Sequence, residues 1–132
     1  MIDMEKAFKF RIYPNKTQQV LLQKTFGCTR YIYNYFLAKR IELYKQDKSS
    51  MSYNQCSKEL TVLKQELTWL KEPDKDALQK SLKDLDVAYK NFFARPEAGF
   101  PKFKSKHGRH KSYRTSYTNG NIKFLGKKIQ LP

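Results

Sequence analysis

Residues 52–93, SYNQCSKELTVLKQELTWLKEPDKDALQKSLKDLDVAYKNFF, decide the fold of this chain because they carry two successive apolar stripes of helical period. The first stripe follows Ser52, which has capping-box spacing to Gln55, and the second follows EPDK, a combination typical of a helix start. Leucine recurs at every third or fourth position in both stripes, which places these side chains on one face of a helix. The stretch therefore predicts helices over 53–70 and 74–93 that share one core.

Two further helices are predicted upstream of this stretch. Asn15 and Gln18 repeat the capping-box spacing, and short apolar spacing continues as far as Gly27, which interrupts or caps the helix. Beyond the glycine, large apolar side chains again recur at intervals of three and four. The sequence thus predicts helices over 15–26 and 28–45, and a bundle of about four helices in all.

Segments with a period of two lie on either side of the helices. KAFKFRIYP, over 6–14, alternates apolar and cationic side chains, and similar alternation appears at 113–117, 122–124 and 129–131. A single N-terminal strand needs a partner for its backbone groups, so we expect it to pair with the C-terminal strands. The prediction is an α+β fold in which the helices are inserted into a partial β-barrel, with further strands expected to follow in sequence.

The charge of the chain indicates a polyanionic partner. The 132 residues contain 27 Lys and Arg against 12 Asp and Glu, a net charge of +15. More than half of this excess lies in residues 95–132, where Glu97 is the single acid. An imbalance of this size favours nucleic acid as the partner.

Length and apolar content exclude several classes of protein. The chain has room for one modest domain, and it contains no apolar run long enough to span a membrane and no secretory signal. Cys28 and Cys56 are too few for a disulfide framework, so we expect them to be reduced and packed. We expect a soluble, cytoplasmic, prokaryotic protein associated with the nucleoid.

Four blocks of the sequence, in order, resemble the N-terminal portion of TnpB (OrfB), the transposon-encoded RNA-guided DNA nucleases akin to type V CRISPR effectors. They are KAFKFRIYPNKTQQVLLQKTFGCTRYIYNYFLAKR, MSYNQCSKELTVLKQELTWLKEPDKDALQKSLKDLDVAYKNFF, GFPKFKSK and SYRTSYTNGNIKFLGKKIQLP. The resemblance implies a wedge domain, an oligonucleotide-binding-like β-barrel, formed by 1–14 and resumed over 97–132. It also implies a helical recognition lobe over 15–96, with duplex DNA, guide RNA and the family's nuclease half as partners.

The resemblance also assigns roles to particular side chains. Those expected to read a short transposon-adjacent motif on duplex DNA are Tyr53, Ser57, Lys75, Gln79, Thr118 and Asn119. The first four form two i,i+4 pairs that lie off the leucine stripes, so each pair shares an outward helix face. Amide, ammonium and hydroxyl groups suit the reading of base edges.

A second set of cations is expected to contact the nucleic-acid backbone. This set comprises Lys9, Arg11, Arg30, Arg40, Lys102, Lys104, Lys106, Arg109 and Arg114. In FPKFKSK, we expect Phe100 and Phe103 to anchor an extended connector while the lysines between them project to phosphates, which supply affinity with little sequence information.

Neither catalysis nor metal binding is expected within these residues. The divalent metal of the family's RuvC nuclease site and the zinc of its downstream ribbon need acids and CxxC pairs that this sequence lacks. His107 and His110 have a spacing that zinc ligands use, but both cysteines are distant, so we expect no metal or other cofactor.

Two other functions stay open from the residues alone. The helices on either side of Gly27 resemble a helix-turn-helix, which would make the chain an autonomous DNA-binding protein. A basic structural protein that binds folded RNA is the other alternative.

Overall fold

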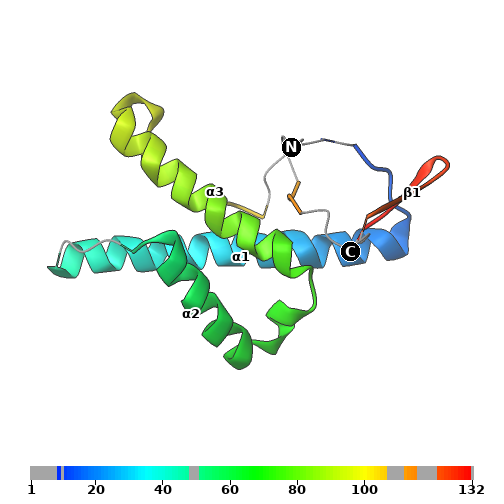
Figure 1. Cartoon of the computed structure of the whole chain (residues 1–132), viewed down its shortest axis with the longest axis horizontal. Helices are drawn as coiled ribbons and strands as arrows, with labels where there is room; N and C mark the ends of the chain where they lie inside the picture. The colour runs from blue at the N-terminus through cyan, green and yellow to red at the C-terminus, as the bar shows by residue number, and fades with distance from the viewer. Residues whose placement is uncertain (1–8, 10, 48–50, 107–111, 116–121, 132) are drawn as a thin grey trace, which may run out of the picture.

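One long helix, two shorter helices and a small hairpin make up the part of the chain that the structure describes (Figure 1). The structure is a computed structural model and describes residues 9, 11–47, 51–106, 112–115 and 122–131. Its elements are α1 (Lys16–Asp47), α2 (Tyr53–Glu66), the 3-10 turn η1 (Thr68–Lys71), α3 (Lys75–Ala94), the 3-10 turn η2 (Pro96–Ala98), β1 (Lys123–Leu125) and β2 (Lys128–Gln130). The protein is therefore mostly helical with a small antiparallel sheet, an α+β composition.

Helix α1 runs for 32 residues without a break, so the predicted end near Gly27 is wrong. Cys28, Ile32 and Phe36, which follow the glycine along one face, are all buried in the core. One glycine inside a helix costs about 1 kcal/mol, and the burial of this face outweighs that cost. The bundle consequently has three long helices in the described residues, and the turn that the helix-turn-helix interpretation placed at Gly27 is absent.

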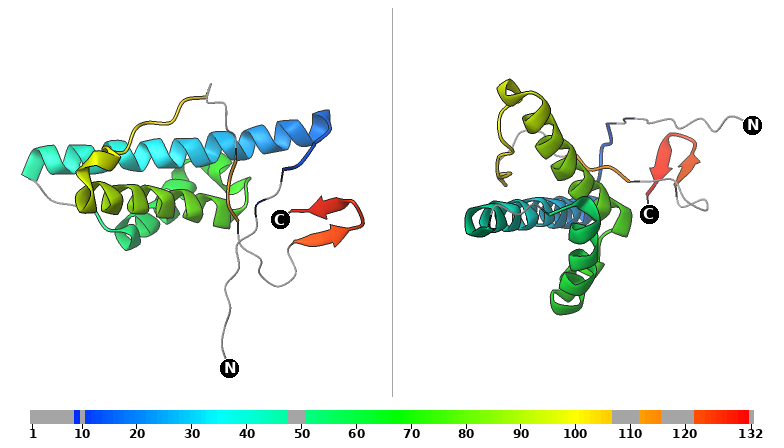
Figure 2. Two further views of the ribbon diagram at one scale, coloured as in Figure 1. Left: turned by 90° about the horizontal axis from the view of Figure 1, so that it is seen from above. Right: turned by 60° about the vertical axis from the view of Figure 1, so that its left-hand side comes forward.

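The core lies where the three helices meet. Helix α3 crosses the middle of α1, and α2 leaves the same region in a different direction (Figures 1 and 2). The largest fully buried side chains are Phe36, Ile32, Leu37, Leu60, Leu70, Leu78, Leu82, Leu85 and Cys56. Both predicted leucine stripes thus face this core, as the sequence indicated.

Helix starts follow the predicted capping signals. Asn15 Oδ1 accepts from the Gln18 backbone N–H at 2.9 Å, and Gln18 Oε1 accepts from the Asn15 N–H at 3.0 Å. Ser52 and Gln55 form the same reciprocal pair at the start of α2. Helix α2 ends at Glu66 rather than at residue 70, because the chain turns into η1 there.

The predicted sheet appears in the described residues as a single hairpin. β1 and β2 are antiparallel, with Phe124 opposite Ile129, and Gly126 takes the positive φ of 65° that their turn requires. Each strand lies one residue from its predicted position. Residues 11–14 and 112–115 have no strand structure, and the other predicted strand residues lie outside the described part.

Residues 11–15 lie at the same end of α1 as the hairpin in every view (Figures 1 and 2). The barrel itself stays a prediction, since no hydrogen bond between these two segments is described. Among the described residues, no helix is both long enough and apolar enough to cross a membrane.

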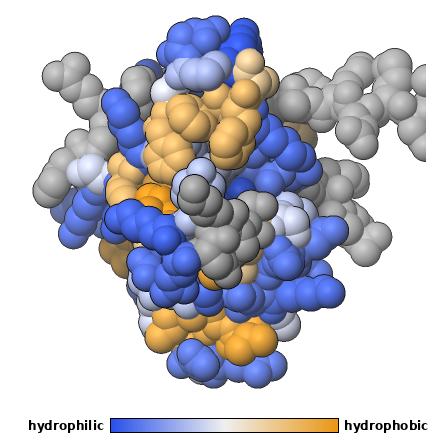
Figure 3. Space-filling view, turned by 90° about the vertical axis from the view of Figure 1, so that its left-hand side faces the viewer, coloured by the Kyte–Doolittle hydropathy of each residue, from blue (hydrophilic) through white to orange (hydrophobic). Residues whose placement is uncertain are grey.

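The connector after α3 folds back onto the helices. Gly99 has φ +86° and ψ 154°, a conformation that other residues rarely adopt, and Pro101 behind it is buried. The Phe100 ring meets Tyr89 and Phe92 edge-on at 5.4 and 5.3 Å between centroids. Apolar surface lies at the level of this end of α3, in the upper part of Figure 3.

A polar clamp fixes the next part of the connector to α1. The Asn34 side chain donates to the Lys104 carbonyl at 2.9 Å and accepts from the Lys104 N–H at 2.8 Å. The connector is thus held by this clamp and by the ring contacts of Phe100, which is itself 42% exposed, whereas Phe103 is 57% exposed and does not serve as an anchor.

Candidate nucleic-acid interface

Three of the predicted motif-reading side chains meet between α2 and α3. The hydroxyl groups of Tyr53 and Ser57 both donate to Gln79 Oε1, at 3.0 and 3.2 Å. All three residues are partly buried. The structure thus joins two helix faces that the sequence could place only separately, while the role of the three residues in reading DNA stays a prediction.

Packing and capping hold this cluster in place. Helix α2 starts at the Ser52 capping box, one residue before Tyr53, and Asp74 caps α3 by accepting from the Asp76 N–H at 3.3 Å. Leu60 and Leu78, which are fully buried, fix the rotation of the two helices about their axes. The cluster therefore belongs to a rigid part of the fold.

The hydrogen bonds of Gln79 determine what the cluster offers a ligand. A carboxamide oxygen has two lone pairs, and both are engaged by the hydroxyls of Tyr53 and Ser57. The amide nitrogen Nε2 has no hydrogen-bond partner within the described ranges. In this arrangement Gln79 presents donors, which suit acceptors such as guanine N7 and O6 or thymine O4, rather than the bidentate pairing with adenine that also needs a free oxygen.

Three lysines add positive charge around this cluster. Lys75 opens α3 and is exposed, and the Lys83 ammonium lies 5.1 Å from the centroid of the Tyr53 ring. Burial and the nearby charge of Lys75 lower the pKa of Lys64, although Asp74 opposes this shift.

Lys64 and Lys83 were not among the predicted site residues. Lys64 follows Ser57 by seven positions and Lys83 follows Gln79 by four, the offsets that keep side chains on one helix face. This signal was available in the sequence, and it places both lysines beside the predicted pairs. We use the name α2–α3 groove for the surface formed by Tyr53, Ser57, Lys64, Lys75, Gln79 and Lys83 where the two helices meet.

The predicted backbone cations lie in different settings. Lys9, Arg11, Lys102 and Lys106 are exposed, and the Lys104 ammonium lies 4.4 Å from the centroid of the Tyr33 ring while the residue stays exposed. Arg114 forms an ion pair with Asp84. Thr118, Asn119 and Arg109 lie outside the described residues.

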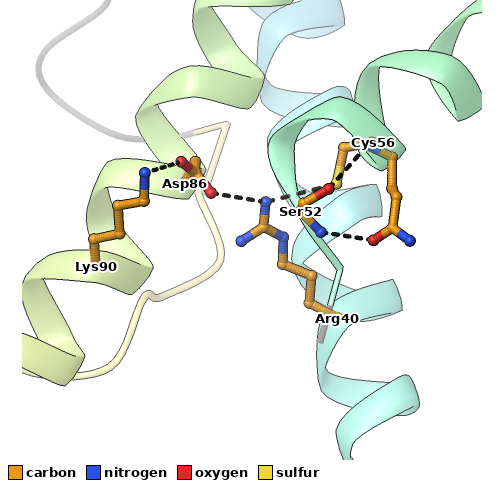
Figure 4. Close-up of polar contacts among 6 residues, drawn as sticks. Arg40, Ser52, Cys56, Asp86 and Lys90 are labelled. Carbon is orange, nitrogen blue, oxygen red and sulfur yellow. Dashed lines mark hydrogen bonds and ion pairs between the residues drawn. The ribbon is translucent and has the colours of Figure 1, made fainter. Parts of the chain in front are cut away.

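Arg40 occupies a different place from the one predicted, as Figure 4 shows. Only 8% of its surface is exposed, and its Nη2 lies 3.4 Å from Asp86 Oδ1 and 3.6 Å from Cys56 Sγ. The guanidinium also stacks 4.9 Å from the centroid of the Tyr89 ring, and Lys90 pairs with the other Asp86 oxygen at 3.1 Å. Arg40 is thus a buried structural cation, so the expectation that it contacts nucleic acid is wrong.

The acids of the described residues do not assemble a metal site. No group of three or more His, Cys, Asp or Glu side chains gathers there, and His107 and His110 fall outside those ranges. Asp86, Asp84 and Glu59 instead form ion pairs with arginine or lysine. That these residues hold no metal stays a prediction.

The comparisons with known proteins agree with the family resemblance of the sequence. A family model described as a helix-turn-helix domain, and named for OrfB and IS605, matches residues 1–49. Within that match the described residues form one continuous helix from residue 16.

Three relatives place the chain more closely. It is 38% identical over 108 residues to a Streptomyces pristinaespiralis protein named as an RNA-guided DNA endonuclease, and 37% identical over 111 residues to InsQ of Escherichia coli, which carries the same description. These matches cover 80% and 83% of this chain, which spans 27% of the length of either relative. The chain is also 34% identical to the virulence protein VsdF of Salmonella dublin, of which it covers 98%. The chain belongs to the OrfB (TnpB) family.

Proposed function

We propose that this chain is a nucleic-acid-binding part of a TnpB-like RNA-guided DNA endonuclease, which reads a short motif on duplex DNA and contacts guide RNA. The observation that carries the proposal is the convergence of Tyr53, Ser57 and Gln79 on one hydrogen-bonded cluster. Residues far apart in sequence meet there, at the edge of the leucine core and beside three lysines. The relatives named as RNA-guided DNA endonucleases support the choice of DNA and RNA as partners.

In this proposal the groove acts as a set of donors directed at the major groove. Lys75 and the Gln79 amide nitrogen would donate to base acceptors, and the hydroxyls of Tyr53 and Ser57 would orient Gln79 from behind. Each bidentate or equivalent base contact discriminates against a wrong base by about 1–3 kcal/mol. The loop that carries Thr118 and Asn119 would complete the reading.

The remaining cations supply affinity in this proposal. Lys102 and Lys106 lie on an anchored connector, so their charges are held near the helices at a small loss of entropy. Residues 1–14 and 97–132 would form the two parts of a wedge barrel that contacts guide RNA. The position of residues 11–15 and the hairpin at one end of α1 supports that division.

A selection from a pool of randomised duplex DNA tests the proposal, because such a pool contains every short motif. The wild-type chain should enrich a short sequence, and Gln79→Ala should lose this enrichment while keeping most of its general duplex affinity. Gln65→Ala is the matched control, because Gln65 is an exposed glutamine on α2 away from the cluster. Equal enrichment by wild type and Gln79→Ala would remove the groove from motif recognition.

Salt dependence separates the two kinds of contact. We expect Lys75→Ala to relax sequence preference with little change in the slope of log affinity against log salt. Lys102→Ala should instead flatten that slope by about 0.9, the value of one phosphate contact on duplex DNA. The reverse pattern would contradict the roles, and stronger binding to folded RNA without any duplex enrichment would favour an RNA-binding structural protein.

A further inference from the structure

A pocket of about 730 Å³ lies between α1 and η1 and does not include any residue of the α2–α3 groove. Its wall includes Tyr31, Tyr35 and Trp69, and its charged residues are Lys24, Arg30 and Glu72. The volume falls within the range of about 300–1,000 Å³ that is typical of small-molecule sites. It is therefore large enough for the base and phosphate of a nucleotide.

The aromatic wall is built by an element that the sequence did not predict. Because α2 ends at Glu66, η1 turns Trp69 towards α1, where its ring meets Tyr31 at 5.0 Å and 72°. Tyr31 in turn stacks on Tyr35 at 5.9 Å and 26°. Trp69 remains 42% exposed although it is the only tryptophan of the chain. A partly exposed indole supported by two phenol rings provides a platform on which a flat ring can stack.

The charges around this platform favour an anion. Arg30 is half-buried, and it has neither an acidic nor another hydrogen-bonding partner in the part of the chain that the structure describes. Lys24 and Glu72 pair loosely at 3.9 Å, with more than half of each side chain exposed, so their charges largely cancel. The Arg30 guanidinium is thus the uncompensated charge of the pocket, and it suits a phosphate oxygen.

We propose that this pocket binds an unstacked base of single-stranded nucleic acid, with the base against Trp69 and Tyr31 and the adjoining phosphate on Arg30. Single-stranded RNA and single-stranded DNA share this chemistry of a flat ring beside an anion. A neutral apolar peptide would leave Arg30 without a partner, whereas a nucleotide satisfies both the ring and the charge. The proposal rests on the proposed function only in its choice of nucleic acid as the partner.

Trp69 makes the site directly observable, because all tryptophan fluorescence of the chain comes from this residue. Titration with a short oligo(U) or oligo(dT) strand should quench the emission to a plateau, and a duplex of equal length should quench it much less. Quenching by oligo(U) alone assigns the pocket to RNA, quenching by oligo(dT) alone assigns it to DNA, and quenching by both means that the pocket ignores the sugar. The proposal would be overturned if neither strand quenched the emission, or if the duplex quenched it as strongly as the single strands.

Variants then test the two halves of the site by anisotropy of a labelled oligo(U) or oligo(dT), whichever quenches. Loss of one stacked base weakens binding by about 1–3 kcal/mol, so Trp69→Ala should weaken it by roughly 5-fold to 150-fold, and Trp69→Phe should restore part of the loss. Arg30→Gln should also weaken it several-fold. Arg95→Gln, at the far end of α3, is the matched control and should bind nearly as tightly as wild type.

Two cross-checks keep this proposal separate from motif recognition. Gln79→Ala should bind the single strand normally, and Arg30→Gln should still enrich the duplex motif. If Trp69→Ala fails to fold, as judged by circular dichroism, Trp69→Phe and Arg30→Gln decide the outcome. An Arg30→Gln variant that binds as tightly as Arg95→Gln would refute the assigned phosphate contact.

Discussion

Replacement of Gly27 by alanine tests the continuity of α1 directly. In the structure Gly27 lies inside a helix of 32 residues, well away from both ends. If the helix instead ended there, the glycine would serve as a left-handed cap, and alanine would be strained in that conformation. The two arrangements therefore predict effects of opposite sign for a change of one methyl group.

The expected gain in stability follows from two terms. Alanine is favoured over glycine inside a helix by about 0.8–1 kcal/mol, because glycine loses more backbone entropy on folding. A Cβ atom at this position would meet nothing nearer than Arg30 Nη2 at 3.8 Å, which is an ordinary van der Waals contact. With no steric cost to subtract, Gly27→Ala should raise the free energy of unfolding by about 0.5–1 kcal/mol, and the melting temperature by roughly 2–5 °C.

Denaturant titration followed by circular dichroism at the helical band measures this difference. Gly99→Ala is the matched control, because Gly99 has φ +86° in a region that alanine enters only with strain. We expect Gly99→Ala to lower the unfolding free energy by about 1–3 kcal/mol. A loss of 1 kcal/mol or more in Gly27→Ala would refute the continuous helix and restore a turn at this glycine.

Two further predictions concern the core. Asp86→Ala should lower the unfolding free energy by about 3–5 kcal/mol, because it leaves the Arg40 charge buried without its carboxylate partner. Asp84→Ala, two residues away in an exposed pair, should lower it by less than about 1 kcal/mol. Equal effects in denaturant titrations would argue against the buried pair. Burial raises the pKa of the Cys28 and Cys56 thiols above their ordinary 9.0, so these thiols ionise at lower pH in the unfolded chain than in the folded one. The stability that the neutral buried thiols contribute is complete below pH 9 and should be lost as pH rises through the folded pKa values. Unchanged denaturation midpoints between pH 8 and 11 would contradict this prediction.

The helices were predictable where an apolar period and a capping signal coincide. Ser52 marks the start of α2, and the leucine stripe of α3 shows which face is buried. Gly27 misled the prediction because local propensity is weak compared with the burial of a whole helix face. The sequence carries no signal for the early end of α2, since Pro73 is the first strong helix breaker and lies seven residues beyond Glu66.

Each helix face of the candidate site could be predicted from the sequence, but the contact between the two faces could not. Spacing of four residues shows that Tyr53 shares a face with Ser57, but the contact with Gln79 depends on how two helices pack. Arg40 shows the opposite case: its spacing indicates a buried position, but its positive charge led us to expect an exposed one. It follows Phe36 by four positions and Leu37 by three, so it lies on the buried stripe and needs a buried acid as its partner.

The base contacts of the two proposed surfaces differ from phosphate contacts, including the one proposed at Arg30, in how they respond to salt, and this difference decides the conditions under which each surface can be detected. Every phosphate contact on duplex DNA loses roughly 3.5-fold in affinity between 50 and 200 mM salt, so six such contacts together lose about a thousandfold or more. Hydrogen bonds to base edges in the α2–α3 groove, and ring stacking on Trp69, depend far less on counterions. With a net charge of +15, low salt would allow non-specific attraction to mask both surfaces. Motif enrichment and Trp69 quenching should therefore become more selective as salt rises, even while total affinity falls. If selectivity falls together with affinity, the groove and the pocket contribute nothing to binding beyond the attraction between charges.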